Sequence, residues 1–256
     1  MTAPLTLDFV LNENYLVGRI LDPEWKGHDD TIDYLREQAI EMSPTATKQL
    51  LEAYRIRFST AHLSPFDASQ QIVLLTEKTR SLLAELKGTP EHKEILEQTH
   101  AYKTRVEQEW LDNLDASLPF MQELTGLPLD GRYAVLVAHP SINFGEYLGA
   151  RIITMGWSAE FANEDTVTLW HEILHDDDIL VGGKNDEVGH SLIEISADNA
   201  LRVHLNGEDY QPLHGEICRR GLRNKIFKND WSGYLNSENK NIRKFKEEMQ
   251  QKYGRI

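Results

Sequence analysis

The segment from Val167 to Asp198 places the tightest constraint on the fold, because it holds histidines and carboxylates at fixed spacings. His171 and His175 are four residues apart. On an α-helix such residues lie on one face, one turn apart, so their imidazole nitrogens can converge on one point. A helix over these residues is therefore the first prediction.

The five residues from His171 to His175 form the pattern His-Glu-x-x-His. Two histidines at this spacing are typical zinc ligands. The glutamate beside the first one can take a proton from a water molecule whose pKa zinc has lowered to about 7. The sequence thus predicts Zn²⁺ as the cofactor, His171 and His175 as metal ligands, and Glu172 as general base.

A catalytic zinc usually has three protein ligands, so a third must come from elsewhere in the chain. Glu194 follows the second histidine after 18 intervening residues. We predict that it lies on a second helix, which begins near Asn185-Asp186 and ends at Asn206-Gly207. Asp198 is one turn further along that helix, where it can accept the other ring proton of His171 and orient it.

Other third ligands are also compatible with the sequence. His190 lies one turn before Glu194 on the same side of the helix, and it could instead be the fourth ligand of a closed structural site. Asp178 lies about 10 Å along the helix from His171, too far unless the helix ends early. The metzincin pattern fails, because Asp178 and Val181 stand at its glycine and last histidine positions.

The full spacing resembles that of the gluzincin metallopeptidases, the clan that includes thermolysin and the zinc aminopeptidases. The resemblance covers about 32 residues. It implies zinc ligands His171, His175 and Glu194, a general base Glu172 and a supporting Asp198. The Gly-Ala/Met-Met-Glu-Asn motif of the aminopeptidases is absent, so no family below the clan is identified.

The resemblance also implies a hydrogen-bond donor for the oxyanion that forms during peptide hydrolysis. In this clan a downstream histidine or tyrosine has that role. Tyr234 and His214 are the candidates here. His204 is a poor one, since it lies about 15 Å along the helix from Glu194 and on another face.

The predicted fold class is α+β. Residues 1–126 form a mainly helical N-terminal region. Residues 127–256 form a zincin-like catalytic region with a small mixed sheet, the HExxH helix, the glutamate helix and a basic helical tail. Asp130-Gly131 gives the turn signal at which the character of the sequence changes.

Three segments have the composition of strands: Leu5 to Leu11, Tyr133 to His139, and Ala150 to Trp157. No partner is evident for the first. We expect Pro140 to Tyr147 to be a loop. In the resembled clan an edge strand of the sheet binds extended substrate by main-chain pairing, and Ala150 to Trp157 is the candidate for that strand.

Helix starts are marked by a side-chain cap, in several cases followed by proline at the first helical position. They are predicted after Asp29-Asp30, at Ser43-Pro44, Ser64-Pro65 and Thr89-Pro90, and at Asn163 for the HExxH helix. Ile32, Leu35 and Ile40 are expected on the buried face of the first. The helix from Ser64-Pro65 should end at Gly88, and the next, over 90–116, should pack behind the sheet. Gly182-Gly183 should end the HExxH helix.

Composition is that of an ordinary soluble protein, with 40% hydrophobic and 27% charged residues. No apolar run approaches the roughly 18 residues of a membrane span. The N-terminus lacks the basic region of a secretory signal, and a lone Cys218 cannot form an internal disulfide. We expect a cytoplasmic protein in which Cys218 is a small buried hydrophobic residue.

The formal net charge of -14 disfavours a nucleic-acid partner. Its distribution is uneven. Residues 219–256 hold 11 Lys and Arg against 4 Asp and Glu, which is +7, so the rest carries -21. This basic tail either lies over the acidic body or docks on an acidic partner surface. The run Asp176 to Asp178 is either solvated or creates a negative field that favours basic substrates.

The predicted function is that of a zinc-dependent metallopeptidase, a hydrolase of peptides or proteins. One alternative is a non-catalytic binding or regulatory protein with a structural zinc. Another is a zinc hydrolase that acts on a non-peptide substrate. The motif specifies the activated water better than the bond that the water attacks.

Overall fold

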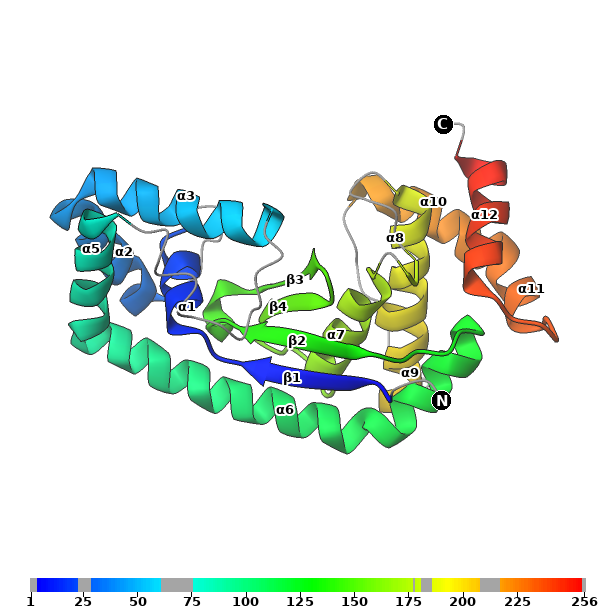
Figure 1. Cartoon of the computed structure of the whole chain (residues 1–256). Helices are drawn as coiled ribbons and strands as arrows, with labels where there is room; N and C mark the ends of the chain where they lie inside the picture. Colours follow the sequence, from blue (N-terminus) through cyan, green and yellow to red (C-terminus); the bar gives the residue numbers. More distant parts are fainter. Residues whose placement is uncertain are drawn as a thin grey trace. The chain divides into compact units, whose positions relative to one another are not determined.

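The computed structural model describes residues 4–22, 29–60, 76–176, 178–180, 186–207 and 217–254. The fold is mixed α+β, as predicted, and the described residues contain mostly helices and one four-stranded sheet (Figure 1). The chain forms two compact units, one of Met1–Leu5, Gln108–Gly131 and Ala159–Ile256, the other of Thr6–Glu107 and Arg132–Ser158. The boundary expected between residues 126 and 127 thus lies inside the first of these units.

The sheet belongs to the second unit and has the strand order β1-β2-β4-β3. Its strands are β1 (Thr6–Val10), β2 (Arg132–Val137), β3 (Phe144–Gly149) and β4 (Ile152–Gly156). β1, β2 and β4 run parallel, and β3 pairs antiparallel with β4. The three predicted strands are confirmed, and the missing partner of the first is β2.

The edge strand is not the one predicted. β4 lies between β2 and β3, so its main chain is paired on both sides and cannot bind an extended peptide. The sheet edges are β1 and β3. β3 begins inside the expected loop and continues two residues beyond it. Its segment Phe144-Gly145-Glu146-Tyr147 has a glycine and a charged residue, which disfavour strands in general but are tolerated at an edge.

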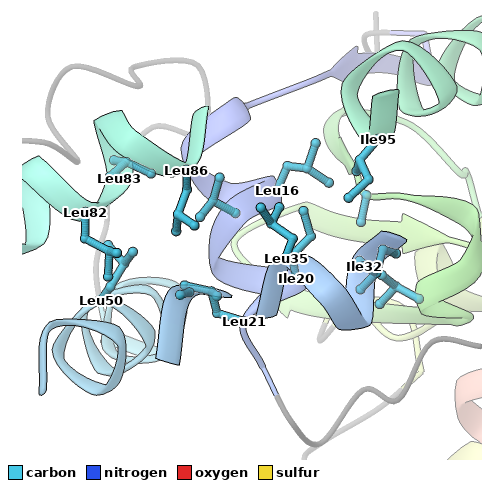
Figure 2. Close-up of a cluster of buried hydrophobic side chains, with 14 of the residues drawn as sticks. Leu16, Ile20, Leu21, Ile32, Leu35, Leu50, Leu82, Leu83, Leu86 and Ile95 are labelled. Atoms are coloured by element: carbon cyan, nitrogen blue, oxygen red, sulfur yellow. The ribbon is translucent and has the colours of Figure 1, made fainter. Parts of the chain in front are cut away.

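The α-helices among the described residues of the second unit are α1 (Glu13–Ile20), α2 (Asp30–Met42), α3 (Pro44–Thr60), α5 (Glu77–Gly88) and the first part of α6 (Pro90–Thr125). They share a core of aliphatic side chains, shown in Figure 2. Its fully buried members include Leu16, Ile20, Ile32, Leu35, Leu50, Leu86 and Ile95.

Local capping explains where several of these helices begin. Ser43 Oγ accepts the backbone N–H of Ala46 at 3.3 Å, and Thr89 Oγ1 accepts that of His92 at 3.1 Å. Both caps are as predicted. The start expected at Ser64-Pro65 lies outside the described residues.

Two details of the helical prediction are wrong. α5 begins at Glu77, where Thr76 caps it, so the helix that ends at Gly88 is shorter than expected. On α2, Ile40 is 48% exposed while Ala39 is buried. The apolar period of the sequence alone did not show that Ala39, and not the larger Ile40, lies on the buried face.

α6 is longer than predicted. It continues past residue 116, through Pro119, to Thr125. Proline lacks the N–H of a helical hydrogen bond and usually ends or bends a helix, which is why the sequence suggested an earlier end.

The first part of α6 packs behind the sheet, as predicted. His139, which follows β2, lies with Nε2 2.7 Å from Gln98 Oε1. Trp157, which follows β4, donates its backbone N–H to the Tyr102 hydroxyl at 2.9 Å. Two polar contacts from one helix therefore hold the ends of two neighbouring strands.

The C-terminal helices of the first unit are α10 (Ile217–Ile226), the π-helical η3 (Phe227–Trp231), α11 (Ser232–Leu235) and α12 (Ile242–Tyr253). Their cations pair with acidic residues of the same unit. The N–O distances are 2.5 Å for Lys246–Asp186, 3.5 Å for Lys240–Glu123 and 2.5 Å for Lys252–Asp230. The first two pairs support the interpretation that the basic tail lies on the acidic body, whereas the third joins two residues of the tail. The side chain of Cys218 lies outside the described part.

Among the described helices, none combines the length and the apolar character needed to cross a bilayer. α6 is long enough at 36 residues, but charged side chains occur throughout it.

Asp186 allows a test of how the glutamate helix is anchored. Its Oδ1 accepts the Gly189 N–H at 2.8 Å, and its Oδ2 lies 2.5 Å from Lys246 Nζ. Burial acts to raise the pKa of Asp186, but the Lys246 ammonium and the Gly189 N–H together lower it. We expect Asp186→Ala to cost about 0.5–2 kcal/mol of stability in urea unfolding at neutral pH.

Asp186→Asn keeps a capping oxygen and loses only the charge. Because the folded pKa lies below the unfolded value, the charge stabilises the fold above about pH 4, and this contribution disappears as the pH falls through the folded pKa. The difference between the parent and Asp186→Asn should therefore vanish in acid. An equal difference at neutral and acid pH would show that the charge contributes nothing.

Candidate metal centre

The HExxH motif lies on α7 (Glu164–Leu174), as predicted. Its apolar face is fully covered, since Trp170, Ile173 and Leu174 are all 0% exposed. Trp170 packs against Trp110 of α6, with ring centroids 5.5 Å apart. Burial of this face fixes the rotation of the helix, which turns the two histidines toward the opposite side.

The first turn of α7 is stabilised by a different side chain from the predicted Asn163 cap. Asn163 occupies the cap position but has a left-handed backbone, with φ of 61°, and its side chain makes no cap hydrogen bond. It bridges Asn113 and Asn206 instead, both at 3.0 Å. The free N–H of Thr166 in the first turn is accepted by Glu109 Oε1 of α6 at 2.8 Å. A carboxylate from a distant helix thus replaces the local cap.

α7 ends earlier than predicted. Its last helical residue is Leu174, with His175 as the C-cap, whereas Gly182-Gly183 lie outside the described residues. Asp176 is only 4% exposed, and its Oδ1 accepts the N–H of Asp178 at 3.0 Å. A short acidic side chain that bonds to its own backbone competes with the helix, and its charge opposes the dipole at this end. Asp176 therefore has a local structural role.

The second helix begins and ends where the sequence predicts. Asp186 caps it, and it continues through α8 (Glu187–Ile193), the π-helical η2 (Glu194–Leu201) and α9 (Arg202–Asn206). The π-helical segment was not predicted. It starts at Glu194, and the wider turn rotates the side chains that follow away from their α-helical positions. Such segments occur frequently at functional sites.

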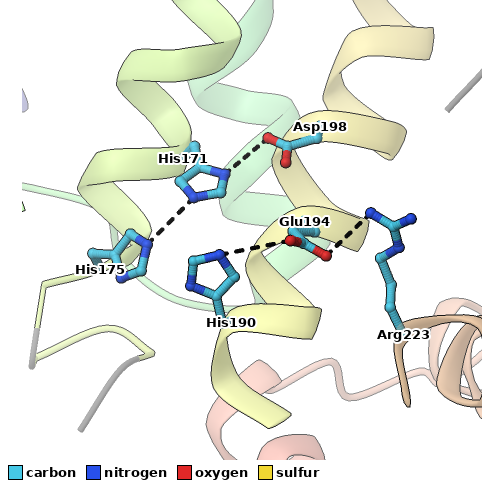
Figure 3. A network of polar contacts seen from close by, with 6 residues as sticks. All are labelled: His171, His175, His190, Glu194, Asp198 and Arg223. Atoms are coloured by element: carbon cyan, nitrogen blue, oxygen red, sulfur yellow. Dashed lines mark hydrogen bonds and ion pairs between the residues drawn. The ribbon is translucent and has the colours of Figure 1, made fainter. Parts of the chain in front are cut away.

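His171, His175 and His190 lie together, and one nitrogen from each falls within 4.8 Å of the others (Figure 3). His171 Nε2 and His175 Nε2 are 3.3 Å apart. Two nitrogens bound tetrahedrally to zinc at about 2.0–2.1 Å would be roughly 3.3–3.4 Å apart. The spacing of the pair is compatible with two ligands of one metal ion, and the group of three could hold such an ion.

Asp198 contacts His171 at the position expected for an orienting carboxylate. Its Oδ1 lies 2.9 Å from His171 Nδ1. A proton on Nδ1 that is donated to Asp198 leaves the Nε2 lone pair directed at the cluster. Burial lowers the pKa of His171, but the carboxylates of Asp198, Glu172 and Glu194 raise it to about 9. The surroundings thus favour positive charge at this position, which a bound cation would also supply.

Glu194 lies at the border of the cluster and outside the group of three. Its Oε1 is 3.6 Å from His190 Nε2, and its Oε2 is 3.1 Å from Arg223 Nη1 of α10 (Figure 3). The structure therefore groups His171 and His175 with His190, while Asp198 contacts His171 and Glu194 lies beside His190 and Arg223. The sequence identified His190 as an alternative ligand. Arg223 could not be found, because nothing local links it to the motif.

Glu172 is largely buried, with 6% of its surface exposed. Its negative charge is felt at the His171 ring, where it helps to raise the pKa.

Tyr234 does not fit the expected role of oxyanion donor. Its hydroxyl donates its single proton to the Leu124 carbonyl at 2.7 Å. Its ring stacks on Trp231 and Phe245, with centroid distances of 5.1 and 4.6 Å, and burial raises its pKa. Tyr234 is a core residue. The other candidate, His214, lies outside the described residues.

Asp198 can be tested as the residue that orients His171. We expect Asp198→Ala to weaken zinc binding by about 10- to 100-fold, because the His171 ring loses the group that fixes its tautomer and orientation. Competition with a chelating dye would measure the affinity. Glu123→Ala, at a side chain that is 79% exposed, is the control. Unchanged affinity in Asp198→Ala would rule out the orienting role.

Comparisons with protein-family models, with curated proteins and with solved structures find no match to this chain.

Proposed function

We propose that the protein is a zinc-dependent metallopeptidase that hydrolyses peptide bonds. One observation carries the proposal most strongly. The histidines of an HExxH helix have their Nε2 atoms 3.3 Å apart, and the other nitrogen of His171 is engaged by a carboxylate. In zinc sites a histidine typically binds the metal through one ring nitrogen and donates a hydrogen bond to a carboxylate from the other.

In this proposal His171, His175 and Glu194 hold the metal. Zinc bound there would polarise the scissile carbonyl and lower the pKa of a water molecule to about 7. Glu172 would take the proton of that water and pass it to the leaving amine. Glu172 is largely buried, so its carboxylate would be poorly solvated while it accepts and passes on this proton.

A second candidate function is supported by the position of His190. Its ring nitrogen lies within 4.8 Å of those of both motif histidines. A zinc bound by all three histidines and Glu194 would have four protein ligands and no open position, which is the mark of a structural site. The protein would then use zinc to join the two helices, as a binding or regulatory protein.

Glu172→Gln separates chemistry from metal binding. We expect it to retain zinc, because the residue is not a ligand, and to lose peptide cleavage by about 10²-fold or more, because the proton acceptor is gone. Zinc content by mass spectrometry and cleavage of a mixed peptide library should be measured on both proteins. Zinc in both without cleavage by the parent would favour the structural site or a non-peptide substrate. A parent that binds no zinc would refute the proposal.

The third ligand is tested by paired substitutions on the glutamate helix. We expect Glu194→Ala to lose zinc, and His190→Ala to keep it, because the proposed site uses the carboxylate. Cobalt substitution gives a second measurement, since the absorption spectrum reports coordination number. Four-coordinate cobalt that loses a nitrogen ligand in His190→Ala would instead show that His190 binds the metal.

A further inference from the structure

A pocket of about 210 Å³ lies between the glutamate helix and the C-terminal helices, next to the candidate metal centre. Four of its lining residues come from η2 and four from α10 and η3. Glu194 and Asp198 belong to both the pocket and the metal centre. Ligand pockets for whole small molecules usually measure about 300–1,000 Å³, so this one has room for a single side chain or a chain end.

The walls of the pocket are largely π-helical. η2 supplies one wall, and η3 supplies Phe227 and Lys228 of the other. π-helical turns are rare and are frequently found at functional sites. Here two π-helical segments line the same pocket. This is a second observation, independent of the pocket itself, that points to a binding role.

The charges that line the pocket favour an anion. Glu194 is paired with Arg223 at 3.1 Å, and Asp198 with His171 at 2.9 Å, so both carboxylates are already compensated (Figure 3). Arg223 has five N–H donors, and its contact with Glu194 leaves others to point elsewhere. Lys228 makes no ion pair within the described part of the chain. A metal ion at the histidines would add further positive charge.

The remaining lining suits the hydrocarbon part of a substrate residue. Ile195 is buried in the wall, while the Phe227 ring is 40% exposed at the pocket. An apolar stem with a charged head would therefore meet both an aromatic side chain and cationic side chains in the lining.

We propose that this pocket binds a carboxylate of the peptide substrate through Arg223 and Lys228. The carboxylate is either an Asp or Glu side chain near the scissile bond or the terminal carboxylate. This inference rests on the proposed peptidase function and names its substrate class. It predicts a preference for acidic groups in the substrate, whereas the hypothesis about Asp176 to Asp178 predicts a preference for basic ones.

Binding of matched fluorescent peptides to the zinc-loaded Glu172→Gln protein tests the proposal without turnover. The peptides differ only by Glu, Gln or Lys at each position, and each is made with a free or an amidated C-terminus. A charge-assisted hydrogen bond contributes about 1.5 kcal/mol or more, so we expect at least about tenfold tighter binding of a peptide with the carboxylate. Comparing Glu with Gln, and free with amidated ends, identifies the source of the carboxylate.

Lys228→Gln should abolish most of that preference, whereas Lys225→Gln, on an exposed side chain of α10 outside the pocket, should leave it unchanged. Arg223 is not the first choice for substitution, because it also holds Glu194. Equal binding of the Glu and Gln peptides with both kinds of C-terminus, tighter binding of the Lys peptides, or an unchanged preference in Lys228→Gln would overturn the inference.

The proposed function fails in a different way. If the parent cleaves peptides without preference for a carboxylate, the peptidase stands and the pocket assignment falls. If the parent neither binds zinc nor cleaves peptides, the peptidase proposal falls, and the same peptides on the metal-free protein then decide whether the pocket recognises carboxylates.

Discussion

The contact between His171 and Asp198 is the interaction on which the candidate site depends. It joins α7, which carries His171, to η2, which carries Glu194, and the side chains of both partners are mostly buried, at 17% and 14% exposed. Charged groups in such a place are costly unless they are paired, so each stabilises the other. The same contact determines which imidazole nitrogen faces the cluster. One hydrogen bond thus serves both the packing of two helices and the chemistry of the site.

The C-terminal helices add further polar contacts around this pair of helices. Arg223 of α10 holds Glu194, and Lys246 of α12 contacts both Asp186 and the Leu180 carbonyl at 2.5 Å. Lys246 therefore touches the chain on both sides of the connection between α7 and α8. The uneven charge of the sequence has a physical explanation here. Acidic residues gathered around the histidines require cations nearby, and the tail provides them.

Features determined by local sequence were predictable, whereas features that depend on distant contacts were not. The HExxH helix and the cap at Asp186 follow from spacing and capping chemistry, which act within a few residues. The strand β3 was missed because its residues disfavour strands and it forms only by pairing with β4. The π-helical turn at Glu194 and the pairing with Arg223 likewise depend on tertiary packing. The hydrogen bond from the Tyr234 hydroxyl to the Leu124 carbonyl likewise could not be seen in the sequence.

The burial of Trp170 has an optical consequence. Its indole is fully enclosed, lies next in sequence to His171, and is 5.5 Å from the ring of Trp110. An indole in such surroundings emits at short wavelength. The molecule therefore contains a buried intrinsic fluorophore on the helix of the HExxH motif, so the packing of that helix against α6 can be followed without any attached label.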